Sequence, residues 1–389
     1  MNFINRYNFY FLLSAFFSIA ILLYIISNIS ISYKESLIYF ENKDLIAKLA
    51  NLSVSYFGNN DYALKLPNLI FHFFNLLLIY LISKKILKYK IDSILCVIIY
   101  SFIPCVIMQG SILNESIITL FVVLLICYVE LVKTKLVYFL LFTAIFISPS
   151  TFMLFIAFFF YAVSKRDKKL AIFSIFCFGI NIYVYGIDIS GKPSGRFLDV
   201  FGELALLYSP PLFIYYVYTL YRNLTKDKPN LLLYISIISF VISFILSIRQ
   251  EIYKEIFLFM SLCGIPLMIK QFLSDIRVRL PMFQNAYKNR FIVVIIFLLF
   301  EVLLLVFSKQ IYIFVENKDK IFLNEFYIAK EISRELKTRN IKRVTTDKKM
   351  QNRLRFYGIK QGGALLKKVA KNGNIIIEYN NQVVARYAI

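Results

Sequence analysis

The chain has 389 residues, of which 59% are hydrophobic and only 17% are charged, and its formal net charge is +22. A soluble domain has a smaller apolar share, so a large apolar surface must face something other than water. The positive charge does not indicate a nucleic-acid partner, because most lysines and arginines lie in short loops between apolar blocks or in the C-terminal tail. Loops beside membrane helices carry such charges under the positive-inside rule. The composition therefore predicts a membrane protein.

Apolar residues gather in blocks of about 17–20 residues, the length that a helix needs to cross a hydrocarbon core. Backbone groups inside lipid must bond to one another, so the blocks are predicted to be helices. The expected fold class is mainly α, a polytopic transmembrane bundle of about 11 membrane segments with a small C-terminal α/β soluble domain. The expected segments are residues 8–29, 66–83, 92–109, 113–132, 136–148, 151–164, 170–187, 205–222, 230–248, 255–272 and 291–308.

The first block runs from Arg6 to about Ile29, too long for a cleavable signal peptide, and we interpret it as a membrane helix. The fifth and sixth blocks are short for full crossings. They are interpreted as a hairpin that dips into the membrane and returns at the turn 148–150.

Two domains are predicted, a transmembrane domain over residues 1–308 and a soluble domain over 309–389. The transmembrane domain has two long loops, 30–65 and 188–204. In the first loop, apolar and polar residues alternate at helical spacing over residues 44–57, which predicts an amphipathic helix on the membrane surface. The second is rich in Gly, Pro, Arg and Asp, and long loops on a rigid scaffold often carry functional sites.

The tail from about Lys309 has a different pattern. Residues 320–340 have helical periodicity, residues 341–346 are predicted to be a strand, and residues 364–371 another helix. Residues 374–379 and 382–387 flank Asn380-Asn381, which predicts a hairpin. The tail contains neither a Gly-rich phosphate loop nor histidine, so we expect no independent active site in it.

Residues typical of soluble enzymes are scarce. The single histidine, His72, lies in the middle of the second predicted membrane segment and is interpreted as a polar packing residue rather than a ligand or base. No zinc spacing, Walker motif or Ser/His/Asp arrangement occurs. The cysteines all lie in apolar blocks without a CxxC pair and are interpreted as small core residues: Cys96, Cys105, Cys127, Cys177 and Cys263.

Two carboxylates stand at the ends of apolar helices on the same predicted membrane face. Glu35 follows the first segment, and Glu115 lies at the turn before the fourth. At equal depth they could line one cleft, where a partly desolvated carboxylate acts as a general base toward an acceptor hydroxyl or helps to bind a cation. Taken singly, each acid could instead be a solvated loop residue or the neighbour of a helix N-cap.

Residues 33–36 (YKES) and 58–67 (GNNDYALKLP) resemble the first outer loop of GT-C glycosyltransferases, the group of protein O-mannosyltransferases and the lipid A aminoarabinose transferase. That family carries an acid just after the first helix, a phrase like "FG…ARLP" before the second, and a second acid at the start of the fourth. Glu35 and Glu115 fall at the acidic positions. The family usually has Asp at both, and Lys65 stands where it usually has Arg.

The resemblance implies sugar transfer from a polyprenyl-phosphate-linked donor to an acceptor (lipid, glycan or protein) at the extracytoplasmic face. Glu35 would be the base, and Glu115 would position the base, the acceptor or a metal. A divalent metal on Glu35 and Glu115 stays open as a cofactor. The leaving phosphate needs cations, and the candidates are Arg249, Lys254 and Arg196. The same cations could instead reach lipid headgroups.

Other classes of protein remain. Glu301 lies within the last apolar block, where an unpaired charge is costly, so a transporter or a flippase of a lipid-linked glycan could use it for coupling. It could equally be a buried packing contact. A third possibility is a non-catalytic membrane scaffold that presents the tail to a partner.

The distribution of charge predicts the orientation. Positive charges cluster in alternate loops, near residues 84–90, 133–135, 165–169, 222–228 and 277–290, and few lie in the intervening loops. The positive-inside rule then places the N-terminus in the cytoplasm. The amino-acid bias toward Ile, Lys, Asn, Phe and Tyr is typical of an AT-rich bacterial genome, so the inner membrane is expected, with the C-terminal domain in the periplasm.

We therefore expect reporter fusions after Lys90 and Lys169 to report cytoplasm, and a fusion after Ile389 to report the extracytoplasmic side. Paired phosphatase and fluorescent-protein reporters at each position provide the measurement. A cytoplasmic signal after Ile389 would contradict either the odd number of crossings or the orientation.

Overall fold

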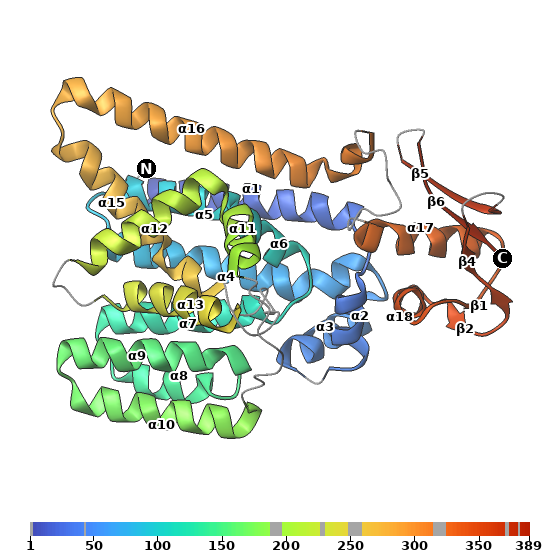
Figure 1. Cartoon of the computed structure of the whole chain (residues 1–389), viewed down its shortest axis with the longest axis horizontal. Coiled ribbons are helices and arrows are strands. Elements are labelled where there is room, and N and C mark those ends of the chain that lie inside the picture. The colour runs from blue at the N-terminus through green and yellow to red at the C-terminus, as the bar shows by residue number, and fades with distance from the viewer. Residues whose placement is uncertain are drawn as a thin grey trace. The chain divides into compact units, whose positions relative to one another are not determined.

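The computed structural model describes residues 3–42, 44–186, 197–225, 230–247, 259–313, 324–369, 373–379 and 382–389. These residues form helices over most of their length and short strands near the C-terminus (Figure 1). They divide into two compact units. The first contains residues 1–18, 70–109 and 115–301, and the second contains residues 19–69, 110–114 and 302–389.

The first unit is a helical bundle. Four helices contribute residues to both units, α1 (Phe3–Asn28), α4 (Asp61–Ile86), α6 (Pro104–Ser111) and α16 (Pro281–Val306). The remaining elements of the first unit are α5 (Lys90–Phe102), α7 (Ser116–Val132), α8 (Leu136–Ala144), η1 (Pro149–Thr151), α9 (Phe152–Lys165), α10 (Lys168–Tyr185), α11 (Phe197–Tyr208), α12 (Pro210–Leu224), α13 (Leu231–Ser247), η2 (Phe259–Gly264) and α15 (Ile265–Val278).

Five helical spans in the described residues are long and apolar enough to cross a membrane, namely Arg6–Asn28, Asp61–Ile86, Lys168–Tyr185, Phe259–Val278 and Pro281–Val306. Two bent helix pairs would raise the total to seven. About 11 segments were predicted, and that number is not confirmed. The segment predicted over 230–248 contains α13, which has 17 residues and falls among the shorter apolar helices rather than the five spans. The segment predicted over 136–148 contains α8, whose 9 residues are far too short for a crossing at 1.5 Å per residue.

Proline breaks two of the predicted spans. The segment predicted over 92–109 is divided into α5 and α6, which meet at an angle of 66° just before Pro104. The segment predicted over 205–222 bends by 105° between α11 and α12, where Ser209 has φ +76° and precedes Pro210. Proline disfavours helical backbone in the residue before it, so an apolar run of sufficient length need not be one straight helix.

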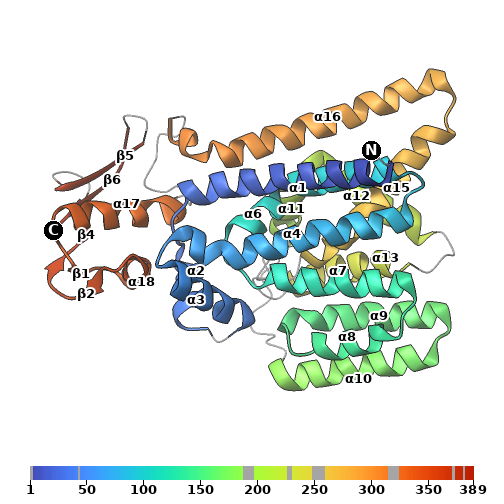
Figure 2. The same cartoon turned by 180° about the vertical axis from the view of Figure 1, so that it is seen from behind.

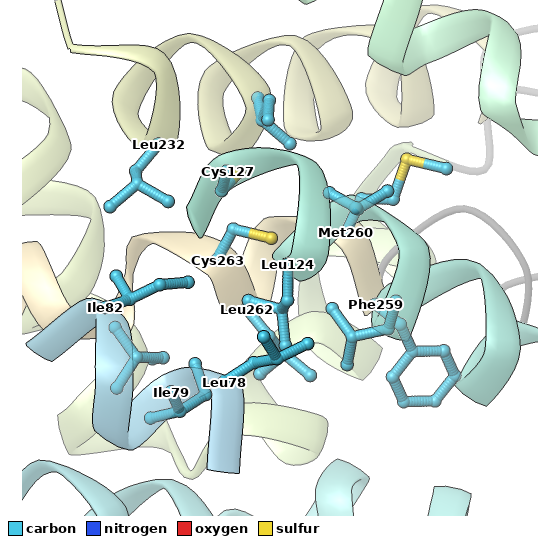
Figure 3. Close-up of a cluster of buried hydrophobic side chains, with 14 of the residues drawn as sticks. Leu78, Ile79, Ile82, Leu124, Cys127, Leu232, Phe259, Met260, Leu262 and Cys263 are labelled. Carbon is cyan, nitrogen blue, oxygen red and sulfur yellow. The ribbon is translucent and has the colours of Figure 1, made fainter. Parts of the chain in front are cut away.

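The core of the first unit is apolar and continuous. Figure 3 shows one part of it, where side chains of α4, α7 and α13 meet those of η2, among them Ile79, Leu124, Leu232 and Cys263. The three neighbours α8, α9 and α10 lie side by side (Figure 1). All five cysteines are buried free thiols.

The outer surface of this bundle is also apolar. On α16 large side chains such as Ile296, Phe297, Leu299 and Phe300 are exposed, and similar residues are exposed on α1 and α10. A surface of this size is not stable in water and requires an apolar solvent around it. Together with the long apolar helices, it defines a multi-pass membrane protein.

The second unit combines the first long loop with the tail. Its own helices are α2 (Tyr33–Phe40), α3 (Leu45–Phe57), η3 (Ser308–Ile313), α17 (Asn324–Thr338) and α18 (Lys348–Phe356). Its strands are β1 (Arg343–Thr345), β2 (Lys360–Gln361), β3 (Ala364–Leu365), β4 (Lys367–Lys368), β5 (Ile375–Tyr379) and β6 (Gln382–Ala388). The helix predicted over 44–57 is present as α3, with Asp44 at its N-cap position.

The strands form two small sheets, β2-β1-β3 with parallel pairs and β4-β6-β5 with antiparallel pairs. Figure 2 shows α17 beside β5 and β6. The predicted helix over 320–340, strand over 341–346 and hairpin are confirmed as α17, β1 and β5–β6. The turn residues 380–381 lie outside the described residues.

The helix predicted over 364–371 is wrong over its described part, because β3 and β4 lie within residues 364–368, and residues 370–371 lie outside the described residues. Gly362 and Gly363 have positive φ and turn the chain so that β3 can pair with β1. A helix that was not predicted, α18, begins after Asp347, whose carboxylate accepts the Met350 N–H at 3.2 Å. Strand pairing over a long sequence separation overrides local propensity here.

Gly264 is expected to be essential for packing in the first unit. A Cβ at this position would overlap the hydroxyl oxygens of Tyr216 and Ser236. We expect Gly264→Ala to lower the free energy of unfolding by about 1–3 kcal/mol, the usual cost of overpacking. Gly179→Ala is the control, because a Cβ there meets no atom within 4 Å, and alanine in α10 should raise stability by about 0.5–1 kcal/mol. Unfolding in detergent followed by circular dichroism at 222 nm measures both, and equal shifts would contradict the packing argument.

Candidate functional site

Glu35 lies at the start of α2 and forms a capping box with Ser32. Its Oε2 accepts the Ser32 backbone N–H at 2.7 Å, and the Ser32 hydroxyl oxygen accepts the Glu35 N–H at 3.2 Å. The side chain is 0% exposed. A capping box satisfies N–H groups that a helix terminus otherwise leaves without partners. The local sequence Ser-x-x-Glu therefore accounts for one oxygen of this buried carboxylate.

The other oxygen of Glu35 binds groups from distant segments of the second unit. Its Oε1 accepts the backbone N–H of Leu113 at 2.8 Å and lies 3.8 Å from Nζ of Lys65, whose side chain is also fully buried. Glu35 thus connects α2, the segment 110–114 and α4. A general base needs a lone pair that the substrate can reach, so base catalysis by Glu35 requires the side chains around it to move. Its role as base stays a prediction.

Asp61 is a second buried acid in the same unit, at the N-terminus of α4. The hydroxyl of Tyr357 donates to its Oδ1 at 2.6 Å, and Nζ of Lys330 lies 2.8 Å from its Oδ2. Asp61 is 3% exposed. Lys330 also donates to the Ser27 carbonyl at 3.1 Å. The carboxylate therefore has a cation and a hydroxyl as partners, as a buried charge requires.

Tyr357 links Asp61 to the start of the first loop. Its hydroxyl oxygen accepts the backbone N–H of Ile31 at 3.0 Å while its proton goes to Asp61. Burial, with the neighbouring Asp61 charge, raises the pKa of the Tyr357 phenol. The phenol therefore stays protonated and keeps donating to Asp61 across the physiological range.

Arg353 of α18 binds the same segment. Its Nε donates to the Ile31 carbonyl at 2.9 Å, and its guanidinium also lies 3.4 Å from the Ser30 hydroxyl. Burial lowers the pKa of the Arg353 guanidinium, and the charge of Glu325 opposes that shift. The segment 30–32 is consequently held by two side chains of the tail.

A cavity of about 570 Å³ opens beside Asp61. Residues 59–62 form one wall, α17 forms another, and Tyr357 completes the lining. Every lining residue carries a polar or charged group, and Lys330, Arg334 and Lys337 are among them, although most of the exposed lining surface is carbon. A second cavity of about 690 Å³ in the same unit is lined in part by the first residues of α17. Its lining includes the cations Lys349, Lys367 and Lys368 and the acids Glu325 and Asp347.

Glu115, the other predicted site acid, belongs to the first unit. It is half-buried at the N-terminus of α7, and its Oε1 lies 3.4 Å from the hydroxyl of Ser148. Ser148 is part of the predicted turn 148–150, which the structure forms as η1 and its N-cap. Because Glu35 belongs to the other unit, the cleft predicted to contain both acids stays a prediction.

The predicted cations Arg196, Arg249 and Lys254 lie outside the described residues, as does most of the loop 188–204. Its last residues begin α11. His72 has the predicted packing role, since its Nε2 lies 2.8 Å from the Ser18 hydroxyl in the first unit. Among the described residues no three His, Cys, Asp or Glu side chains gather as a metal site would require.

No protein-family model matches this sequence, and no curated protein is significantly similar to it. Function is therefore inferred from the residues themselves.

Sequence reasoning missed Asp61, Lys330, Tyr357 and Arg353 as parts of one cluster. Asp61 does stand inside the phrase 58–67 that carries the family resemblance, and the Asn60 side chain before it accepts the Ala63 N–H as an N-cap. That local pattern marks the start of α4. The partners of Asp61 could not be found in this way, because Tyr357 is 296 residues further along the chain.

Removal of the Tyr357 hydroxyl should destabilise the second unit. Tyr357→Phe leaves the Ile31 N–H and one Asp61 oxygen without this partner, so we expect the free energy of unfolding to fall by about 1–3 kcal/mol. Tyr56→Phe on α3 is the control, because that side chain is 78% exposed and should be neutral. Chemical denaturation of the full chain in detergent gives both values. A Tyr357→Phe variant as stable as the control would show that the Asp61 cluster contributes little.

Proposed function

We propose that the chain is a membrane glycosyltransferase that moves a sugar from a polyprenyl-phosphate donor to an acceptor at the extracytoplasmic face of a bacterial inner membrane. The observation that carries the proposal is Glu35, an acid on the helix directly after α1. Its side chain is fully buried, and its Oε1 lies 3.8 Å from Nζ of the equally buried Lys65. The GT-C resemblance expects its first acid at this place.

In the proposed reaction an acceptor hydroxyl attacks the anomeric carbon of the donor, and the bond from that carbon to the phosphate oxygen breaks. The hydroxyl proton passes to Glu35, and the lipid phosphate leaves with the bonding electrons. Cations stabilise the phosphate as charge develops on it, and Arg249, Lys254 and Arg196 remain the proposed residues for this. Glu115 would position the acceptor, the base or a divalent metal.

The contacts of Glu35 bear on this role. The ammonium group of Lys65 lies 3.8 Å from Oε1 of Glu35, so a positive charge faces the proposed base. The N–H groups of Ser32 and Leu113 each donate to one lone pair, the first on Oε2 and the second on Oε1 of Glu35. A carboxylate has about four lone-pair sites, so one direction on each oxygen is left for an acceptor hydroxyl. The acceptor could reach Glu35 only if neighbouring side chains moved.

We expect Glu35→Gln to lower sugar transfer by about a hundredfold or more, the scale of a lost general base. The assay is transfer from a radiolabelled polyprenyl-phosphate sugar in membranes with equal expression of each variant. Glu41→Gln, an exposed position at the end of α2, is the matched control and should retain activity. Arg249→Ala should weaken donor binding, and Glu115→Gln should also impair transfer.

The Ser32 and Leu113 N–H groups bind different oxygens of Glu35. Glutamine replaces one of those oxygens with an NH2 donor, so in the same side-chain geometry one of the two N–H groups loses its acceptor. The folded fraction of Glu35→Gln must for that reason be measured beside its activity. Full activity would refute the assignment of Glu35 as base. A loss of activity equal to the loss of folded protein would make Glu35 a positioning residue.

One observation favours a transporter or flippase instead. Glu301 lies in α16, is half-buried, and its Oε2 accepts no hydrogen bond within the described part of the chain. An intramembrane carboxyl with a free oxygen is suited to proton coupling. Proton-dependent movement of a labelled lipid-linked glycan in reconstituted vesicles, without any sugar transfer, would support this function over the first.

A further inference from the structure

The cavity beside Asp61 has an excess of positive charge. Lys330, Arg334 and Lys337 occur at spacings of four and three residues along α17, so they share one face of that helix, and all three line the cavity. Asp61 is the acid in the lining. It is 2.8 Å from Lys330, so that its charge compensates this lysine. Two positive charges are left facing the cavity.

Arg334 and Lys337 are exposed and form neither an ion pair nor a hydrogen bond in the parts of the chain that the structure describes. The nearby acids of α17 form ion pairs with other cations, although the charge of Arg334 also acts on Glu331. Glu331 lies 3.6 Å from Lys309, and Glu335 lies 3.8 Å from Arg339. The two cations at the cavity are therefore available to a ligand.

Hydrogen bonds from side chains to the backbone hold the facing wall in place. The Asn60 side chain accepts the Ala63 N–H at 2.7 Å and donates to the Phe57 carbonyl at 2.9 Å. The Asn59 amide donates to the Phe356 carbonyl at 3.2 Å, which ties this wall to α18. Tyr62 is about half exposed beside them and offers an aromatic ring with a polar tip.

We propose that this cavity binds a phosphate monoester. Arg334 and Lys337 hold the phosphate oxygens, and the wall formed by residues 59–62 faces the group that carries the phosphate. A phosphate monoester has a charge near −2 at neutral pH, which matches the two cations of the cavity that form no ion pair. Guanidinium groups bind phosphate through paired hydrogen bonds. The volume of about 570 Å³ falls within the roughly 300–1,000 Å³ usual for small-ligand sites.

The proposal concerns binding and does not require sugar transfer, so each can fail without the other. The test uses the full chain in nanodiscs of neutral phosphatidylcholine and measures binding by isothermal titration calorimetry. The probes are glucose 6-phosphate, uncharged glucose and short-chain dihexanoyl phosphatidic acid. The first and third are phosphate monoesters from a soluble and a lipid source.

The variant Arg334→Gln/Lys337→Gln removes both cations of the cavity. Its control is Lys342→Gln/Arg343→Gln, which removes one lysine and one arginine at exposed positions of the same unit that line neither cavity. We expect the cavity variant to weaken binding of a phosphate monoester at least tenfold. The control should change it by less than about twofold, and glucose should not bind.

Binding of glucose 6-phosphate alone would identify a soluble sugar phosphate as the ligand source, and binding of dihexanoyl phosphatidic acid alone would identify a lipid headgroup. Either result supports the proposal when the cavity variant loses it. Absence of binding for both probes would overturn it. Equal losses in the cavity variant and the control would also overturn it, because the attraction would then be general to a basic protein.

Discussion

Burial of charge is the constraint on which the second unit depends. Glu35, Asp61, Lys65 and Arg353 are all almost fully removed from solvent. Removing an ion from water costs several kcal/mol even after relaxation, and only paired charges and hydrogen bonds offset that cost. Glu35 and Asp61 are in the first loop and α4, whereas Lys330, Arg353 and Tyr357 belong to the tail. The loop and the tail therefore need each other.

This dependence affects how function is assigned. The tail contains no motif of its own, yet it supplies the partners of Asp61 and one wall of the cavity. A domain that looks catalytically silent in sequence can thus determine the shape and charge of a site made from another segment. The first loop and residues 302–389 belong to one compact unit, so a change in the tail alters the surroundings of the loop.

Figure 3 shows the different solution adopted in the first unit, where apolar side chains fill the core. Two acids of this unit form ion pairs, Asp92 with Arg277 at 2.7 Å and Glu130 with Lys165 at 2.6 Å. Backbone groups in such a unit must be satisfied within helices. Pro104 and Pro210 interrupt a helix inside an apolar region. At each of them the chain bends and a new helix begins.

The sequence by itself determined the membrane class, the helical content, α3, α17, β1 and the β5–β6 hairpin, because composition and periodicity reflect burial within a few turns of chain. It also indicated Glu35 as an acid of interest. The tertiary structure decided that Glu35 is buried in a capping box, that Asp61 has partners almost 300 residues away, and that residues 364–368 are strands. Hydrophobic periodicity reports which side of a local segment is buried and cannot predict a hydrogen bond between residues that are distant in the sequence. The geometry of buried charges therefore became visible only when the loop and the tail were folded together.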